Sequence, residues 1–406
     1  MSINKLQNSI VGISLITAAC LIGDSMLYIV LPLHFTEAGL DNLWEVGAIL
    51  SVNRFIRLPL NPLVGWLYRK IALRTGIMLA IILAVLTTIA YSFIQGLYAW
   101  LFVRCVWGLA WTFLRLGAYF TILDLSTEQN RGYLMGKYNG LYRLGSLFGM
   151  LFGGFIADFY GLSNTALLFG IITILAIPLS LLTLPVPVNR FSADEANPQQ
   201  KNLLLDSSIY NNSQVIWVLF MGMGVAMIFQ GMFAATLSYL VELHNSANIS
   251  FLLWNVGAAS LAGILQALRW GWEPWLAPWI GGKTDGRTGR YPLFIISLIV
   301  SCLLFLLISR PMSIYLWLSL VLGIQVTATA LTTIVDALAA DIAIKTAQHS
   351  VMTWYSLFID LGAALGPVLA YLLDQYIAVY SACWGVAVLL IVMATTTYWQ
   401  HRLGNA

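Results

Sequence analysis

The sequence predicts an all-α polytopic membrane protein with twelve transmembrane helices in two six-helix bundles. Three observations support this fold class: an apolar composition, a series of apolar runs long enough to cross a bilayer, and an internal repeat. Of the 406 residues, 60% are hydrophobic and only 9% are charged, and the mean hydropathy is +0.83. A soluble domain carries about 25% charged residues. The composition therefore excludes a cytosolic enzyme, a nucleic-acid-binding protein and a disordered chain, and we expect the chain to be embedded in a lipid bilayer.

The apolar runs follow one another along the whole chain, and each can supply the roughly 20 residues that a helix needs to cross the hydrocarbon core. They lie at about 9–35, 44–67, 76–95, 98–122, 137–160, 164–185, 214–241, 249–272, 291–309, 313–337, 350–374 and 379–399. One polar stretch, 187–212, divides them six and six, and we interpret it as a cytoplasmic linker. The predicted domains are therefore an N-terminal bundle at 1–186 and a C-terminal bundle at 213–406.

The basic residues predict the orientation, because Lys and Arg are enriched in cytoplasmic loops. With the N-terminus inside, the predicted cytoplasmic segments hold 13 of the 20 basic residues, and the opposite loops hold only Arg310. The other six basic residues are arginines inside apolar runs. We therefore expect both termini on the cytoplasmic side of a multi-pass protein of the bacterial inner membrane.

An internal repeat relates the two predicted bundles at an offset of 216–217 residues. The matched pairs include Pro62 with Pro278, Gly65 with Gly281, Arg74 with Arg290, Gly145 with Gly362, and Gly149 with Gly366. At the same offset Arg57 corresponds to Glu273 and Arg143 to Asp360, so the halves carry opposite charges at paired positions. A parallel repeat of six helices is the architecture of one large class of transporters, in which the substrate binds between the halves.

Glycine motifs occupy the same place in each half. They comprise Gly145, Gly149 and Gly153 in the fifth run, and Gly362, Gly366 and Pro367 in the eleventh. Met150 stands where the first motif would have its proline, and the fourth run carries Arg104 four residues before Gly108. With these motifs the chain resembles the major facilitator superfamily, whose exporters carry G-x-x-x-G-P-x-x-G-G and R-x-x-x-G. The resemblance implies two bundles related by a pseudo-twofold axis, a gating role for the glycines, and a part for Arg104 in proton coupling.

Two features limit what these motifs imply. Glycines four residues apart also let helix backbones pack closely, so plain packing is an alternative to gating. A further family motif, in the loop after the second helix, is degraded in the first half, where Arg69 and Ala72 replace its Asp and second Gly. The second half keeps Asp285, which is therefore the predicted gating residue of that loop.

Charged residues inside the apolar runs are the main guide to function, because a charge at mid-membrane usually faces a cavity or a partner. They are Asp24, Arg54, Arg57, Arg104, Arg115, Arg143, Arg269, Glu273, Asp336 and Asp360. All lie on helices that line the central cavity in the family which the chain resembles. Away from the ends of the first five runs, five arginines accompany one aspartate, and guanidinium groups bind carboxylates or phosphates bidentately. This excess predicts a small anionic substrate, although any single arginine could instead hold the bundle together in an ion pair.

We assign these residues to two predicted sites. Asp24, Arg104 and Asp360 form the predicted proton-coupling set, because a buried acid beside an arginine can change its protonation between states. The predicted substrate-binding set joins charges with aromatic and amide groups at mid-helix. Its members are Arg54, Arg57, Arg115, Arg143, Asn53, Tyr28, Trp111, Tyr142, Gln230, Trp254, Arg269 and Glu273. For the aromatic members, packing or contact with lipid is the alternative.

The specific functional prediction is proton-coupled export of a small anionic metabolite, such as a citrate-type carboxylate siderophore. The exporter-type glycine motifs favour this direction, and the arginine excess favours an anion. A multidrug efflux pump is one alternative, although such pumps favour cations and need acidic pocket residues. An importer of an organic anion or a peptide is another alternative, because alternating access runs in either direction.

A membrane-embedded enzyme or receptor is disfavoured by the sequence. The four cysteines lie inside apolar runs, the four histidines are scattered without metal-ligand spacing, and no catalytic cluster or serine elbow is present. We therefore expect no enzymatic activity, no cofactor, no bound metal and no nucleic-acid partner. The expected partners are the substrate, protons and the bilayer, and we expect a monomer.

Overall fold

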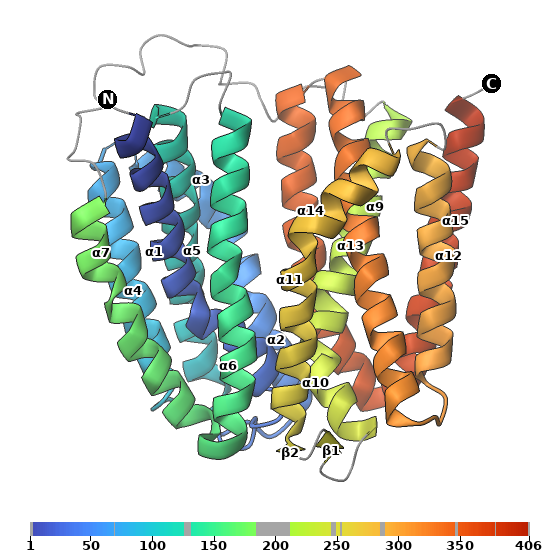
Figure 1. Cartoon of the computed structure of the whole chain (residues 1–406), viewed down its shortest axis with the longest axis horizontal. Coiled ribbons are helices and arrows are strands. Elements are labelled where there is room, and N and C mark those ends of the chain that lie inside the picture. The colour runs from blue at the N-terminus through green and yellow to red at the C-terminus, as the bar shows by residue number, and fades with distance from the viewer. Residues whose placement is uncertain are drawn as a thin grey trace. The chain divides into compact units, whose positions relative to one another are not determined.

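The computed structural model describes residues 3–68, 70–125, 131–183, 212–244, 249–251, 254–284, 289–345, 348–377 and 379–404. These residues are helical apart from loops, turns and one short hairpin (Figure 1). The chain divides into two compact units. Unit 1 comprises Met1–Asn197 and Leu237–Trp270, and unit 2 comprises Pro198–Thr236 and Gly271–Ala406.

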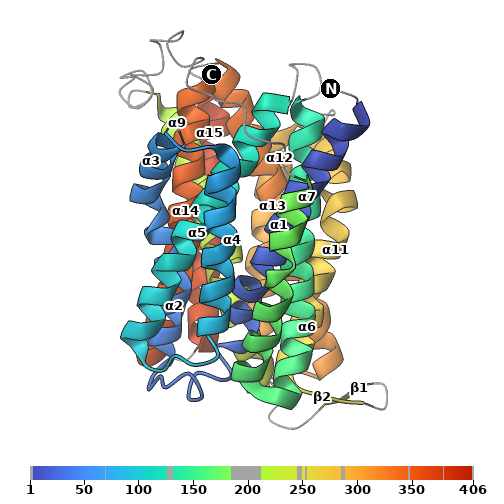
Figure 2. The same ribbon diagram turned by 90° about the vertical axis from the view of Figure 1, so that its left-hand side faces the viewer.

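Unit 1 begins with a series of consecutive helices. They are α1 (Ile3–Val30), α2 (Leu43–Phe55), α3 (Arg57–Leu67), α4 (Leu73–Ala90), α5 (Leu97–Leu125), α6 (Arg131–Ile174) and α7 (Ala176–Thr183). The later segment of the unit adds most of α10 (Phe233–His244), the strands β1 (Ile249–Phe251) and β2 (Trp254–Val256), and the first half of α11 (Ala258–Thr284). Figure 2 shows α4 beside α5, and these two helices pack against each other, as α1 does against α6.

Unit 2 holds the remaining elements. They are α9 (Ser213–Val225), the π-helix η4 (Ala226–Met232), the first turn of α10, the end of α11, α12 (Arg290–Ile308), α13 (Ile314–Lys345), α14 (Gln348–Tyr376) and α15 (Val379–Gly404). Within this unit α14 packs against α9 and η4, and α12 packs against α13 and α15. The chain passes from α9 into η4 without a break, because Val225 and Ala226 keep helical dihedral angles.

The described residues supply twelve membrane spans. Nine helical stretches among them are long and apolar enough to cross a membrane. One of these, Lys137–Thr183, is 47 residues long and reverses direction at Gly161, so it counts as two spans (Figure 1). The α2–α3 segment and α11 complete the twelve; α2 and α3 are each short, and α11 carries Arg269 and Glu273. The predicted all-α fold class with twelve spans is therefore confirmed.

Proline and glycine explain the breaks in the regular helices. Pro59 has no N–H to donate to the carbonyl of Phe55, and its ring crowds that carbonyl, so α2 gives way to α3 at Ile56. At Gly161, φ is 75° and ψ is 178°, a backbone conformation that glycine adopts without the penalty of a Cβ. The next amide, of Leu162, donates to the Glu37 carboxylate at 3.0 Å. The second leg of α6 therefore starts with a capped N–H.

The start of the eighth predicted span, at 249–272, was wrong. The chain first forms an antiparallel hairpin, in which Ile249 lies opposite Val256, and α11 begins only at Ala258. A short apolar run is compatible with a strand as well as with a helix, and hydropathy alone does not separate the two. The helix then continues to Thr284, well beyond the predicted end.

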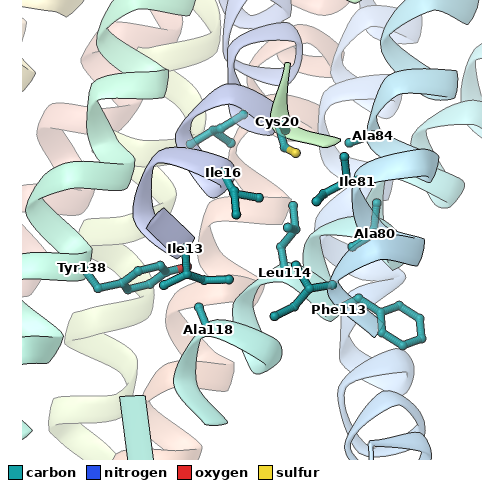
Figure 3. Close-up of a cluster of buried hydrophobic side chains, with 14 of the residues drawn as sticks. Ile13, Ile16, Cys20, Ala80, Ile81, Ala84, Phe113, Leu114, Ala118 and Tyr138 are labelled. Carbon is teal, nitrogen blue, oxygen red and sulfur yellow. The ribbon is translucent and has the colours of Figure 1, made fainter. Parts of the chain in front are cut away.

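The core of unit 1 fixes α1 and α5, which carry the charges described below. Figure 3 shows part of this cluster of buried side chains, which α1, α4 and α5 mainly supply, with further members from α3, α6 and α7. It includes Ile13, Ile16 and Cys20 of α1, Ala80, Ile81 and Ala84 of α4, Phe113, Leu114 and Ala118 of α5, and Tyr138 of α6. Asp24 follows Cys20 by one helical turn, so the packing of Cys20 places Asp24 at the end of this core.

Candidate transport site

An ion pair lies at the centre of the polar site in unit 1. Arg104 on α5 is fully buried, Asp24 on α1 is 8% exposed, and Nη1 of Arg104 donates to Oδ1 of Asp24. Asn53 on α2 donates its Nδ2 to the same carboxylate oxygen at 3.3 Å. The fold thus brings together two predicted coupling residues and one predicted substrate-binding residue. A buried charge of either sign is costly unless it is paired, and here each one stabilises the other.

Two further groups hold the guanidinium of Arg104 in place. Its Nε donates to the backbone carbonyl of Ile49 on α2 at 3.1 Å, and Nη1 also donates to the hydroxyl of Tyr91 at 3.3 Å. The ring of Tyr91 stacks on Trp100 with 5.2 Å between centroids. The sequence analysis did not single out Tyr91, because it follows α4 directly and looks like an ordinary residue at a membrane interface.

Some polar atoms beside this ion pair have no hydrogen bond within the described part of the chain. They are Nη2 of Arg104, Oδ1 of Asn53 and Oγ1 of Thr88, and all three are buried. Thr88 packs directly on Gly23, the neighbour of Asp24. An unsatisfied buried donor or acceptor is costly. Each of these atoms therefore has the capacity for a further hydrogen bond.

Arg54 and Arg57 flank the boundary between α2 and α3, one on each helix. Nε of Arg54 donates to the hydroxyl of Tyr28 at 3.3 Å, and Nε of Arg57 donates to the backbone carbonyl of Asn53 at 3.1 Å. Arg57 is 8% exposed. Through Asn53 these residues adjoin the ion pair, so the predicted substrate-binding and coupling residues of the first two spans form one polar cluster.

A second cluster of predicted residues surrounds the facing sides of α5 and α6. Arg115 donates from Nε to the hydroxyl of Tyr119 at 3.3 Å and lies 5.6 Å from the centroid of the same ring. Trp111 meets Tyr142 edge to face at 5.9 Å. Tyr142 also packs against Tyr138, with 5.0 Å between ring centroids. These rings form an aromatic wall in unit 1 that continues from the core of Figure 3.

One tryptophan brings together two predicted substrate-binding arginines. The guanidinium carbon of Arg143 on α6 lies 5.3 Å from the ring centroid of Trp270, and that of Arg269 on α11 lies 5.5 Å from the same ring. Arg269 is 5% exposed. Cation–π contacts of this kind orient a guanidinium without neutralising its charge. No sequence signal places Trp270 beside Arg143.

These contacts are not the only ones that the arginines make. Further interactions with other groups involve Arg54, Arg57, Arg115, Arg143 and Arg269, and likewise Glu273 and Asp360. The cationic residues are therefore embedded in a network.

Unit 2 contains three further predicted residues. Gln230 lies in η4, Glu273 in the second half of α11, and Asp360 in α14, and each is partly buried. Trp254 lies in β2 and not in the middle of a helix, which corrects the basis on which it was chosen. Asp285, the predicted gating residue, lies outside the described residues.

The motif glycines of unit 1 form a close seam with α1. A Cβ at any of the three positions would collide with the neighbouring helix. The opposing groups are the backbone of Ala18 for Gly145, the backbone of Ile22 for Gly149, and the Cβ of Met26 for Gly153. Each step of four residues on α6 is matched by a step of four on α1, so the two helices run in contact over at least two turns.

The corresponding glycines of unit 2 form a seam with α9 and η4. A Cβ at Gly362 would collide with the carbonyl of Met223, and one at Gly366 would collide with the Cα of Gly231 in the π-helix. Pro367 follows directly and lies inside α14. Both motifs therefore serve close helix packing, and a gating role for them stays a prediction.

Sequence comparison identifies relatives of one family. The family model described as Major Facilitator Superfamily matches residues 13–277. An uncharacterised MFS-type transporter of Methanocaldococcus jannaschii is 22% identical over 265 residues, which make up 65% of this chain and 67% of that protein.

Several solved structures share the fold. A bacterial homologue of the human lysosomal transporter Spinster, in an inward-facing and unoccupied conformation, aligns with a TM-score of 0.77 at 14% identity over 99% of this chain and 98% of that one. The nucleoside transporter NupG aligns with a TM-score of 0.75 at 16% identity over 98% of each chain. A POT family transporter in complex with a thioalcohol-conjugated peptide gives 0.72 at 13% identity, over 96% and 94%. At these identities the similarity concerns the fold alone.

Proposed function

Because the chain belongs to the major facilitator superfamily and is a multi-pass secondary transporter, we propose that it couples proton movement to the export of a small anionic metabolite. A citrate-type carboxylate siderophore is the specific candidate. In this proposal two halves, 1–186 and 213–406, alternate access to a shared site and are joined by a cytoplasmic linker at 187–212. Both termini face the cytoplasm of a bacterial inner membrane.

The observation that carries the coupling proposal is the buried pair of Asp24 and Arg104. A proton carrier must be an acid that can be charged in one state and neutral in another. Arg104 stabilises the charged form of Asp24, and protonation would remove that attraction and release the guanidinium. The buried Oδ1 of Asn53 and Nη2 of Arg104, which have no hydrogen bond within the described part of the chain, offer new partners to both groups. Asp360 on α14 is the candidate for a second protonatable site.

The arginine clusters support an anionic substrate. Arg54, Arg57, Arg115 and Arg143 lie on spans of unit 1, and phenol, indole or backbone groups orient each of them. An oriented fork binds a carboxylate bidentately. The aromatic wall of Trp111 and Tyr142 would pack against the flat or apolar parts of such a substrate.

The coupling proposal is tested by Asp24→Asn. Asparagine keeps the shape and a hydrogen-bond acceptor but cannot carry a proton, so we expect substrate exchange to persist while accumulation against a gradient is lost. The measurement is transport in proteoliposomes with and without an imposed pH gradient. Asp41→Asn, the same change in an exposed loop, is the matched control and should stay coupled. If Asp24→Asn keeps its full dependence on the proton gradient, Asp24 is a structural residue.

The substrate proposal is tested by Arg57→Ala and Arg143→Ala. The loss of one charge-assisted hydrogen bond costs about 1.5–3 kcal/mol, so binding of a carboxylate siderophore should weaken roughly 10- to 150-fold in each variant. Lysine at these positions should restore little where the contact is bidentate. Arg310→Ala, at an exposed loop, should bind normally. Unchanged affinity in both folded variants would make these arginines structural.

A ligand screen on the purified protein separates the alternatives. Thermal stabilisation by anionic siderophores or citrate agrees with the proposal, because a ligand that binds only the folded state stabilises it. Stabilisation by lipophilic cations alone would instead identify a multidrug pump. Stabilisation by peptides or sugar phosphates, with uptake in proteoliposomes, would identify an importer.

A further inference from the structure

The first turn of α11 is held by a carboxylate from another helix. Asp158 on α6 accepts two hydrogen bonds from Ser260, one from the backbone N–H at 2.8 Å and one from the side-chain hydroxyl. Neither the substrate prediction nor the coupling prediction involves this aspartate. It lies one turn before the reversal at Gly161, and α11 starts directly after the β1–β2 hairpin (Figure 1).

Asp158 supplies a cap that α11 cannot provide for itself. The first amides of a helix have no partner within the helix, and a side chain at the preceding residue usually accepts one of them. Here that residue is Gly257, whose carbonyl accepts the first helical bond from Leu261 at 3.1 Å and which has no side chain. A Cβ at Gly257 would have all three of its nearest atoms in the Asp158 carboxylate. The glycine therefore leaves the space that the carboxylate occupies.

Below this cap the two helices meet backbone to backbone. A Cβ at Gly154, one turn before Asp158, would collide with the carbonyl of Ala259. On the other helix, a Cβ at Gly263 would lie 2.5 Å from the carbonyl of Met150. Small residues thus bring α6 and α11 into contact over two turns, and Ala259 in this seam is fully buried. The seam and the cap together hold α11 against α6 at one end of unit 1.

This end is the one opposite the N-terminus. Leu162, just past the reversal of α6, donates to Glu37 in the loop that follows α1, and Ser163 donates to the carbonyl of Ser92 in the loop that follows α4. With the orientation predicted from the basic residues, it is the external end.

We propose that Asp158 acts as a latch. It holds the start of α11 against α6 and keeps this end of the transport path closed. Its hydrogen bonds to Ser260 break once in each transport cycle. The proposal rests on the alternating-access function of the transporter but not on the identity of its substrate or coupling ion. A carboxylate suits this task because its bonds to a helix N-terminus are strong yet involve one side chain, so displacement of that side chain breaks every hydrogen bond of the cap at once and leaves only the seam. In this role Asp158 is a positioning residue that does not touch the substrate.

The test measures exposure of the seam directly. A cysteine placed by Ala259→Cys, in a protein whose four native cysteines are replaced, is labelled by a membrane-impermeant thiol reagent in proteoliposomes. Loss of hydrogen bonds to a charged group shifts a two-state equilibrium by about one to two orders of magnitude. Asp158→Asn and Asp158→Ala should therefore raise the labelling rate roughly 10- to 100-fold, and Ser260→Ala should raise it less, because the backbone N–H remains. Ser163→Ala, which removes a bond at the same end but not to α11, is the matched control and should leave the rate unchanged.

A double variant separates a latch from a helix cap. In the double variant Asp158→Ala/Gly257→Asp, the aspartate introduced at position 257 caps α11 from within its own chain segment. It occupies the space that the Asp158 carboxylate fills in the natural protein. A latch predicts that thermal stability returns while labelling of the thiol introduced by Ala259→Cys stays fast. If stability and slow labelling both return, Asp158 only caps α11 and the proposal is wrong.

The proposal also fails if labelling is unchanged in folded Asp158→Asn and Asp158→Ala. Because no substrate or proton gradient enters this measurement, its outcome is independent of the transport assays. Failure of the siderophore or coupling experiments therefore leaves the latch testable, and the reverse also holds.

Discussion

Two ion pairs between an arginine and an aspartate occupy different environments in this protein. In unit 1, Arg104 and Asp24 join α5 to α1, and their side chains are 0% and 11% exposed. In unit 2, Arg290 at the start of α12 pairs with Asp341 on α13 at 2.8 Å, and these side chains are 22% and 46% exposed. Arg290 also donates to the backbone carbonyl of Ala337. The residue types are the same, but the second pair is far more exposed.

The difference shows how burial decides what an ion pair can do. Water solvates Arg290 and Asp341 when they separate, so the pair adds little net stability and its protonation has little consequence. Arg104 and Asp24 have no such alternative, because a lone buried charge costs several kcal/mol. A proton on Asp24 therefore changes the energy of the whole cluster, whereas a proton on Asp341 would change only a local contact.

The largest expected effect comes from Arg104→Ala. This variant leaves the Asp24 carboxylate buried without its cation, which should cost about 3–5 kcal/mol of stability and abolish coupled transport. Thermal unfolding in detergent and transport in proteoliposomes are the two measurements. Restoration of stability by the second change Asp24→Asn would show that the cost comes from the unpaired carboxylate. A fully stable single variant would remove the energetic distinction between the two ion pairs.

A much smaller effect is expected from Arg290→Ala. An exposed ion pair contributes about 0–1 kcal/mol to stability. Without Arg290, the backbone carbonyl of Ala337 can accept a hydrogen bond from water instead. Stability should fall by no more than this amount, and proton dependence of transport should be unchanged. A loss of stability as large as that of Arg104→Ala would mean that Arg290, which the internal repeat matches to Arg74, is as important as the buried ion pair.

A similarly small effect, confined to one pH range, is expected at the surface of unit 1, for Glu37→Gln. Partial burial would raise the pKa of Glu37, but the hydrogen bonds from His34 and from the N–H of Leu162, together with the attraction of His34, lower it below its ordinary value of 4.5. A lowered folded-state pKa contributes stability that is present above about pH 4.5 and lost as the pH falls through the lowered value. Because Glu37 is well exposed, the contribution should be about 0.2–1 kcal/mol at most.

The check is thermal stability of both proteins from pH 7 to pH 3. The gap between the natural protein and Glu37→Gln should be widest near neutral pH and should close below pH 4.5. Glu242→Gln, at an exposed position on α10, is the control and should show no such gap. A gap that widens in acid would contradict the assigned direction of the pKa shift.

The sequence alone identified several residues that the tertiary structure brings together in unit 1. Asp24 and Arg104 are far apart along the chain, yet both were chosen because an isolated charge in an apolar run must find a partner. The glycine motifs were equally informative, because a missing Cβ at steps of four marks a helix contact wherever it occurs. In each case the property that identified the residue, charge or size, is also the property that fixes its contact.

The sequence failed where a contact depends on two residues that look ordinary by themselves. Trp270 is one of several tryptophans on α11, and nothing in the sequence pairs it with Arg143. Asp158 was omitted because it lies at the very end of the apolar run 137–160, where an aspartate resembles a surface residue. Trp254 was chosen on the assumption of a helix, but the short apolar stretch around it forms a strand.

By itself the sequence determined that this protein is a membrane protein of twelve helical spans, with a repeated half and with buried charges concentrated in the first. Those features follow from hydropathy and from the cost of placing charge in hydrocarbon, which act on each segment separately. Only the tertiary structure decided that Asp24 pairs with Arg104 and Asn53, that Trp270 receives two guanidinium groups, and that Asp158 caps α11. Such contacts depend on which helix faces turn toward each other. Side-chain packing between distant segments sets those faces, so the sequence of one segment alone does not reveal them.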